Sequence, residues 1–151
     1  MQTFLPDKSF FKSAACLDFR RLGKQRVEAL QILNVLAGRS KGWRKHPAIR
    51  MWRGYETALA FYKDLCIEEW TRRGYKNTMT YGYPYISDCL PFTLSMGEDY
   101  CLASRAVKLP QWLGDEALHA SHRSNLLRKD PDFYSQYKWR EPPNLSYIWP
   151  D

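Results

Sequence analysis

The chain has 151 residues, which predicts one domain, residues 1–151, with a core large enough to fold by itself. Its 23 Lys and Arg residues against 16 Asp and Glu residues give a net charge of +7, which favours partners that carry phosphate groups. The apolar runs are short and interrupted by charge, which excludes a transmembrane span and a membrane partner. The first residues lack the basic and long apolar segments of a secretory signal, so we expect a cytoplasmic location.

Residues 1–8 are expected to be extended, and Ser9 suits the N-cap of a first helix. The apolar spacing predicts that this helix continues to Leu36 with a kink at Gly23, and Gly38 is expected to end it. The apolar stripe of this helix consists of Leu17, Leu22, Val27, Leu30, Leu33 and Leu36.

A second long helix is predicted to begin at Pro47, because proline suits the first turn of a helix. It is expected to run to about Arg73, where Gly74 ends it. The apolar residues that recur at intervals of three or four along it are Trp52, Tyr55, Leu59, Tyr62 and Cys66.

The remainder of the chain is rich in Tyr and Pro, and its irregular spacing indicates ordered loops. Residues 75–110 are expected to form such a loop, with one short helix from Glu98 to Val107. A final helix is predicted to begin at Asp115 and to run through Lys129, and the tail after it is expected to pack across the surface. The sequence therefore predicts an all-α fold, a compact single-domain helical bundle with long ordered loops.

The four cysteines have no C-x-x-C spacing, which is typical of reduced thiols that behave as small apolar side chains. The sequence predicts neither a disulfide framework nor a zinc site. The cysteines are Cys16, Cys66, Cys89 and Cys101.

One carboxylate, Glu28, lies in a strongly basic stretch, LDFRRLGKQRVEALQILNVLAGRSKGWRKHP, which spans residues 17–47. One interpretation is a surface ion pair with Lys24, four residues earlier, which gives a few tenths of a kcal/mol at most. The alternative is a half-buried carboxylate that stabilises a developing cation or moves protons beside a surface that binds a polyanion. The spacing alone leaves both interpretations open.

The sequence offers few activated nucleophiles, because it contains no G-x-S-x-G motif, no P-loop and no dinucleotide fingerprint. An ordinary lysine, with a pKa of about 10.4, is almost wholly protonated at neutral pH, whereas an ordinary α-amine has a pKa of roughly 7.7–8.0. Gln2 is too large for efficient removal of the initiator methionine, so we expect Met1 to supply the terminal amine.

The last predicted helix carries two histidines, His119 and His122, three residues apart, as metal ligands sometimes are. No third ligand stands out nearby, so no metal site is predicted. The cationic residues Arg123, Arg128 and Lys129 make the same helix a candidate phosphate-contacting surface, and a solvated polar face is an equal alternative.

Three stretches are similar to one known family. The first, LDFRRLGKQRVE, fits L-x10-E and ends on Glu28. The second continues without a gap to GRSKGWRKHP and is similar to a G-[YW]-R-x-H-P motif of bacterial members. The third, LHASHRSNLLRKDPDFY, is similar to a late basic helix followed by P-x-[WFY]-Y. On these residues the chain resembles the pyrimidine-dimer DNA glycosylase family of phages and bacteria.

The resemblance implies a compact helical domain that kinks double-stranded DNA and flips a base out of the stack. It also implies that the amine of Met1 attacks the sugar C1′ and displaces the base, after which the Schiff base undergoes β-elimination and nicks the strand. Glu28 is expected to stabilise the sugar cation or to move protons. No cofactor is implied.

The expected partner is double-stranded DNA with a damaged or modified base, bound by a monomer in a bacterial or phage-infected cell near the nucleoid. Trp43 is either a wedge in the base stack or a core residue at a helix start. The residues expected to contact DNA are Lys24, Arg26, Lys41, Trp43, Arg44, Lys45, His46, His119, His122, Arg123, Arg128 and Lys129.

Two further interpretations use the same basic scaffold. The first is a DNA-binding protein without catalysis, and the second is an enzyme that acts on another modified base or on a nucleotide. Duplex binding that weakens strongly with salt supports any DNA-binding interpretation. Only loss of strand cleavage with retained binding in a Glu28 variant separates the enzyme from the binder.

Overall fold

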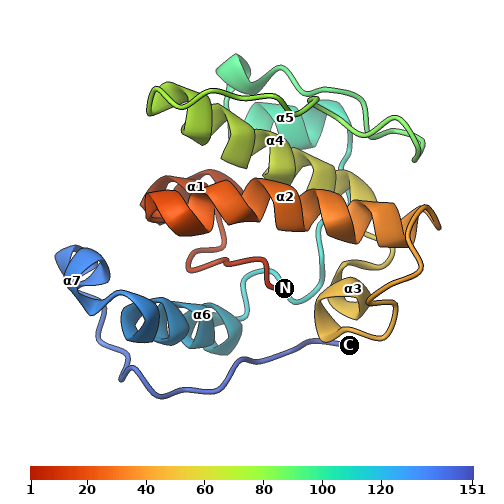
Figure 1. Ribbon diagram of the computed structural model, residues 1–151. Coiled ribbons are helices and arrows are strands. Elements are labelled where there is room, and N and C mark those ends of the chain that lie inside the picture. Colours follow the sequence, from red (N-terminus) through yellow and green to blue (C-terminus); the bar gives the residue numbers. More distant parts are fainter.

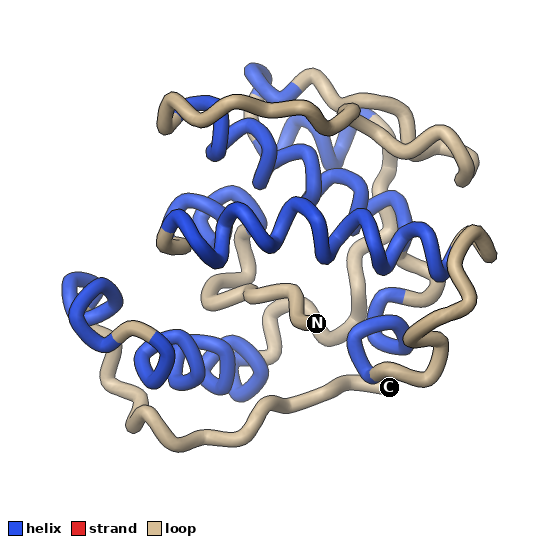
Figure 2. The backbone as a smooth tube through the Cα atoms, viewed as in Figure 1, coloured by secondary structure: helices blue, strands red, loops and turns tan.

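The computed structural model describes residues 1–151 and contains only helices and loops (Figure 2). This confirms the predicted all-α class. Two short 3-10 helices cover Leu94–Met96 and Ser135–Tyr137. The α-helices are α1 (Phe10–Cys16), α2 (Phe19–Leu36), α3 (Pro47–Trp52), α4 (Glu56–Arg72), α5 (Glu98–Ser104), α6 (Glu116–Lys129) and α7 (Pro131–Tyr134).

The first predicted helix is two helices, α1 and α2, so the expected kink at Gly23 is wrong. Asp18 divides the helix because its backbone is extended and its carboxylate caps the start of α2. The Tyr134 hydroxyl donates to the same carboxylate at 2.5 Å. Gly23 has a packing role instead, since a Cβ there would lie 3.1 Å from the Trp70 ring of α4. The absence of a side chain thus lets α2 pack closely against α4.

The second predicted helix is also divided, into α3 and α4. Pro47 begins α3 as expected, but Gly54 has a φ of +87°, which ends the helical path before α4 begins at Glu56. The far end agrees with the sequence-based prediction, because α4 ends at Arg72 and Gly74 follows with a φ of +93°.

Residues 75–93 form the expected ordered loop, which a buried ion pair of α4 fixes. Lys63 donates from Nζ to the Asp64 carboxylate and to the Thr80 carbonyl, each at 2.8 Å, and both charged side chains are fully buried. The Asp64 carboxylate also accepts the Gly82 N–H at 2.9 Å. Burial raises the pKa of Asp64, and the Lys63 charge opposes that shift. The loop therefore depends on α4 for its path.

The N-terminal segment, residues 1–6, runs through the interior between α2 and α6 (Figure 1). Tyr62 of α4 donates from its hydroxyl to the Phe4 carbonyl at 2.7 Å. From α6, the ring of His122 accepts the Leu5 N–H at 2.9 Å. Side chains thus replace the strand partners that an extended buried segment needs for its backbone groups.

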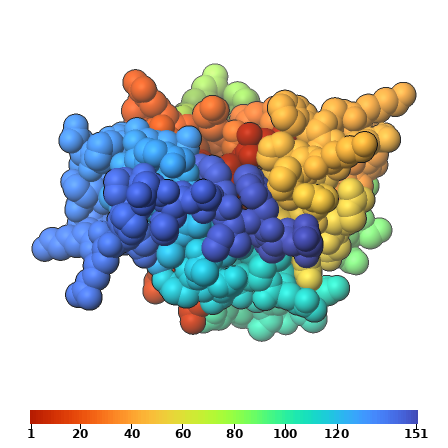
Figure 3. Space-filling model, turned by 90° about the horizontal axis from the view of Figure 1, so that it is seen from below, coloured from red at the N-terminus to blue at the C-terminus, as the bar shows by residue number.

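The C-terminal tail follows α6, as expected for a tail packed across the surface (Figure 3). Ser124 Oγ accepts the Leu145 N–H at 2.9 Å, and Asn125 donates from Nδ2 to the Leu145 carbonyl at 3.1 Å. Ser121 Oγ accepts the Ile148 N–H at 3.3 Å. These polar residues of α6 therefore bind the tail and are buried by it.

The four cysteines are free thiols, as expected. None of the seven α-helices has the length and apolar character that crossing a membrane requires.

Gly82→Ala tests the fixed path of the loop. A Cβ at Gly82 would lie 2.7 Å from the Cys89 carbonyl oxygen and from the Pro91 nitrogen, and φ there is +71°. We expect a loss of about 3 kcal/mol in the free energy of unfolding, measured by urea titration. Gly42→Ala is the control, because nothing lies within 4 Å of its Cβ position. Equal stability of the two variants would contradict this account.

Candidate active site

A surface pocket of about 400 Å³ opens where the N-terminal segment, α2, α6 and the C-terminal tail meet. Figure 3 shows a small patch of N-terminal atoms between the tail and the segment near residues 40–50. The pocket brings together four residues predicted from the sequence and five that were not. Its lining consists of Met1, Gln2, Phe4, Arg20, Arg21, Lys24, Glu28, Lys129 and Tyr147.

Glu28 is half-buried in this pocket and is hydrogen-bonded to the backbone of Gln2. Its Oε2 accepts the Gln2 backbone N–H at 3.3 Å and the Gln25 Nε2 at 3.3 Å. Gln25 Nε2 also donates to the Gln2 carbonyl at 2.7 Å. Both backbone groups of residue 2 are therefore held, and Met1 lines the same pocket as Glu28.

Cationic side chains surround Glu28. Arg21 and Lys24 precede it by seven and four residues, which places them on its face of α2. Lys129 reaches the pocket from α6. Partial burial lowers the pKa of Lys129, and the charges of Arg21, Arg128 and Lys24 lower it further. This crowding of positive charge favours an anion at the pocket mouth.

His46 belongs to the surroundings of the same pocket. Its Nδ1 accepts the Ala48 N–H at 3.0 Å and so caps α3. Partial burial lowers its pKa first, the positive N-terminal amine lowers it further, and Glu28 acts in the opposite direction. Burial and the N-terminal amine together favour the neutral imidazole, and Glu28 offsets them only in part.

Trp43 lies at the surface, with 64% of its side chain exposed and a φ of +63°. The interpretation of this residue as core is therefore wrong. Its ring lies 5.6 Å from the ring of His46, edge to face. Lys41, Arg44 and Lys45 around it are exposed as well, so the whole basic segment faces solvent.

Two of the predicted cations point elsewhere. The Arg26 guanidinium lies 4.2 Å from the centre of the Trp70 ring on another face of α2 and does not line the pocket. Arg123 donates to Glu141 at 2.6 Å and also binds Glu116. Its charge is therefore matched within the protein. Arg128 is exposed at the end of α6.

His119 and His122 are buried, with 1% and 0% of each exposed, so the expectation that they contact DNA is corrected. His119 binds the Leu5 carbonyl through Nδ1 at 2.7 Å, and its Nε2 accepts the Gly114 N–H at 3.0 Å. His122 binds the Leu5 N–H, as described above. Both imidazoles thus satisfy backbone groups of the interior and have no access to a phosphate.

Five pocket residues were missed. Arg20 and Arg21 precede Glu28 by eight and seven residues, so helical periodicity applied to this carboxylate would have found them. Gln2, Phe4 and Tyr147 come from extended segments at the two chain ends, and no periodic pattern in the sequence indicates that they meet.

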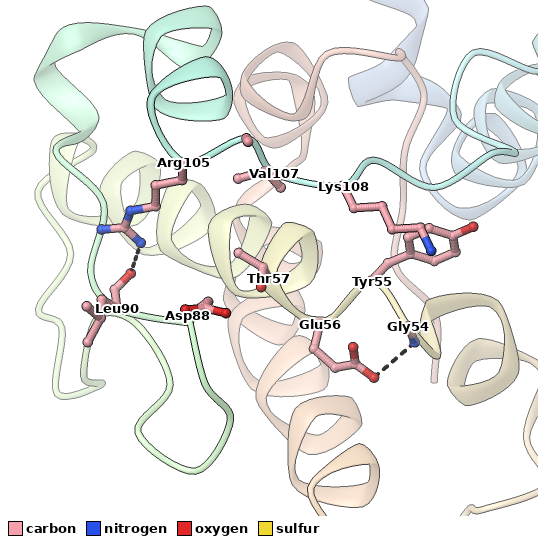
Figure 4. Close-up of a pocket in the computed structure, with 10 residues that line it drawn as sticks. Gly54, Tyr55, Glu56, Thr57, Asp88, Leu90, Arg105, Val107 and Lys108 are labelled. Carbon is pink, nitrogen blue, oxygen red and sulfur yellow. Dashed lines mark hydrogen bonds between the residues drawn. The ribbon is translucent and has the colours of Figure 1, made fainter.

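A second pocket lies at the start of α4 (Figure 4), and neither Met1 nor Glu28 lines it. Two of its charged side chains are already hydrogen-bonded to backbone groups of the protein. Arg105 donates to the Leu90 carbonyl, and Glu56 accepts the Gly54 N–H at 3.0 Å. None of the residues predicted to be functional lines this pocket.

A cationic pocket with one half-buried carboxylate beside a chain terminus is an arrangement suited to enzymes that act on nucleic acids. The sequence matches the family described as pyrimidine dimer DNA glycosylase over residues 1–82. This match covers more than half of the 151 residues, and the chain therefore belongs to that family of DNA repair glycosylases. Comparisons with curated proteins and with solved structures gave no match.

The buried position of His122 predicts a specific pH dependence of stability. Burial lowers its pKa from 6.5 to about 3, so the unfolded state binds the proton more readily between these values. The stability contributed by the neutral imidazole is present above pH 6.5 and is lost as the pH falls toward 3. The loss is up to about 4 kcal/mol.

His122→Gln retains an acceptor for the Leu5 N–H but removes the titrating group. We expect its unfolding free energy, measured by urea titration at each pH, to fall less steeply between pH 6.5 and 3 than that of the parent. His46→Gln, at a half-buried position, should change that slope much less. Parallel curves for the parent and His122→Gln would show that another group causes the acid sensitivity.

Proposed function

We propose that the protein is a DNA glycosylase with AP-lyase activity, which excises a damaged or modified pyrimidine, most favourably a pyrimidine dimer. One observation carries this proposal beyond family membership. Met1 and Glu28 line the same cationic pocket, and the N–H of Gln2, the residue next to the terminal amine, donates to the Glu28 carboxylate. Amine and carboxylate are the two groups that Schiff-base chemistry at a sugar requires.

The α-amine of Met1 is the proposed nucleophile. An ordinary α-amine is unprotonated about a tenth of the time at neutral pH, far more often than an ordinary lysine. Lys24 and Lys129 also line the pocket, and both side chains are exposed, which suits phosphate contacts even though partial burial and the neighbouring cations lower the pKa of Lys129. We therefore assign them to binding and Met1 to chemistry.

The proposed reaction has two stages. The Met1 nitrogen forms a bond to the sugar C1′, the bond from C1′ to the base breaks, and the base departs with the electron pair. Loss of a proton from the nitrogen and ring opening give the Schiff base, which activates the C2′ proton. Removal of that proton breaks the C3′–O bond and nicks the strand. Glu28 stabilises the cationic sugar and carries these protons.

The surrounding charges support double-stranded DNA as substrate. The rim of the pocket consists of Arg20, Arg21, Lys24 and Lys129, and the exposed segment from Lys41 to His46 extends the positive surface beyond it. Cations in such an arrangement bind the backbone phosphates around one extruded nucleotide and fix the register of the duplex.

Borohydride trapping on a duplex with one abasic site tests the nucleophile. We expect a covalent adduct on the peptide that contains Met1, identified by mass spectrometry, because reduction fixes the Schiff base at the attacking nitrogen. An adduct on an internal lysine would retain a lyase but reject Met1. Tight duplex binding without any adduct would instead favour the non-catalytic DNA-binding protein.

Glu28→Gln tests the carboxylate, since the amide oxygen still accepts the Gln2 N–H and keeps the local geometry. We expect strand cleavage of a lesion-containing duplex to fall by roughly 100- to 10,000-fold, with duplex binding retained. Glu56→Gln at the second pocket is the matched control and should cleave like the parent. Cleavage at the parental rate by Glu28→Gln would remove Glu28 from the mechanism.

Lys24→Ala tests the phosphate contacts. Loss of one cation should weaken binding to all duplex sequences, and the slope of log K against log salt should become shallower by about 0.9. Lys108→Ala, which removes a cation at the second pocket, should keep the parental slope. Fluorescence anisotropy over a range of salt concentrations measures both, and identical slopes for the two variants would contradict the proposed DNA-binding face.

A further inference from the structure

We propose that the side-chain amide of Gln2 donates a hydrogen bond to a carbonyl oxygen of the departing pyrimidine and so stabilises the leaving base. This inference rests on the function proposed above and adds a residue to it. Nothing in the family match assigns a role to this side chain.

The starting observation is an unpaired donor. Only 6% of Gln2 is exposed, and its Nε2 is buried with no hydrogen-bond partner. Its Oε1 accepts the Thr3 N–H at 2.9 Å. Exchanging the two atoms by an amide flip would bring Nε2 against that N–H, so the orientation with Nε2 unpaired is the favourable one. A buried donor without a partner is costly, and an arriving acceptor removes that cost.

The second observation is where this donor lies. Gln2 lines the candidate active site together with Met1 and Glu28. Its backbone N–H donates to Glu28 and its carbonyl accepts from Gln25, so the residue is fixed on both sides. The amide is therefore preorganised relative to the carboxylate, which is the condition for stabilising charge that develops during a reaction.

The third observation is the character of the walls. Phe4 and Tyr147 line the same pocket, with ring centres 6.3 Å apart and ring planes inclined by 54°. Aromatic walls beside a few polar groups are typical of sites for planar, partly apolar ligands such as a nucleobase. In the proposed complex, a base in this pocket shares the pocket with Gln2.

The chemistry requires a donor at this position. When the bond from C1′ to the pyrimidine N1 breaks, the electron pair stays on the base, and the negative charge is shared between N1 and the C2 carbonyl oxygen. An ionised Glu28 only accepts hydrogen bonds and cannot stabilise that charge. A neutral amide N–H directed at the oxygen can, in the same way as a donor of an oxyanion hole.

Two substitutions remove the donor in different ways. Gln2→Glu keeps an oxygen for the Thr3 N–H and replaces the NH₂ group, and Gln2→Met keeps the length of the side chain without polar atoms. Both leave a large residue at position 2, so Met1 is retained. Gln31→Glu makes the first change at an exposed position of α2 and is the matched control.

Each variant is assayed on two duplexes, one with a pyrimidine dimer and one with an abasic site that has already lost its base. We expect base excision to fall about 100-fold in both Gln2 variants, which is the cost of removing one oxyanion-stabilising donor. Borohydride trapping on the abasic duplex should be unchanged, because no base departs. Gln31→Glu should match the parent in both assays.

The two assays separate the failure of this inference from that of the proposed function. Parental protein that forms no adduct with the abasic duplex overturns the proposed chemistry, and the role of Gln2 falls with it. Parental trapping with undiminished excision by the Gln2 variants overturns the role of Gln2 alone. Excision and trapping that fall in parallel show a structural role for Gln2 and overturn the inference as well.

Discussion

The structure depends on the side chain of Gln25, which is fully buried and binds the N-terminal segment from α2. Its Nε2 donates to the Gln2 carbonyl, and its Oε1 accepts both the Phe4 N–H and the Tyr62 hydroxyl. Because every one of these partners is buried or half-buried, loss of the amide would leave several unpaired polar groups in the interior. One side chain thus joins the chain terminus, α2 and α4.

This connection determines the site. An extended segment at a chain end normally frays, because few contacts hold it. Here the segment crosses the core, its second residue is hydrogen-bonded to Glu28, and its first residue lines the same pocket. The surrounding cations belong to α2 and α6, which face each other across that segment (Figure 1). A held terminus between two cationic helices is the arrangement that the proposed amine chemistry and the proposed phosphate contacts require.

The differences between expectation and structure have local causes. Periodicity predicted where apolar stripes run but not where helices divide, because Asp18 and Gly54 act through a cap and a positive φ that need the surrounding structure. On α6, residue type suggested a polar face for DNA. Instead, His119 and Asn125 form hydrogen bonds with backbone groups of the N-terminal segment and of the tail. The residue pattern of α6 alone does not show that these distant segments bind its polar side chains.

The sequence by itself determined the all-α class, the helical stripes, the basic charge and the family. These properties follow from neighbours along the chain and from motif spacing. Only the tertiary structure decided that Met1, Gln2 and Tyr147 meet that carboxylate and that the α6 histidines are interior. The reason is physical, since an extended segment takes its path from hydrogen bonds to distant side chains, and residues far apart in sequence become neighbours only when the core closes.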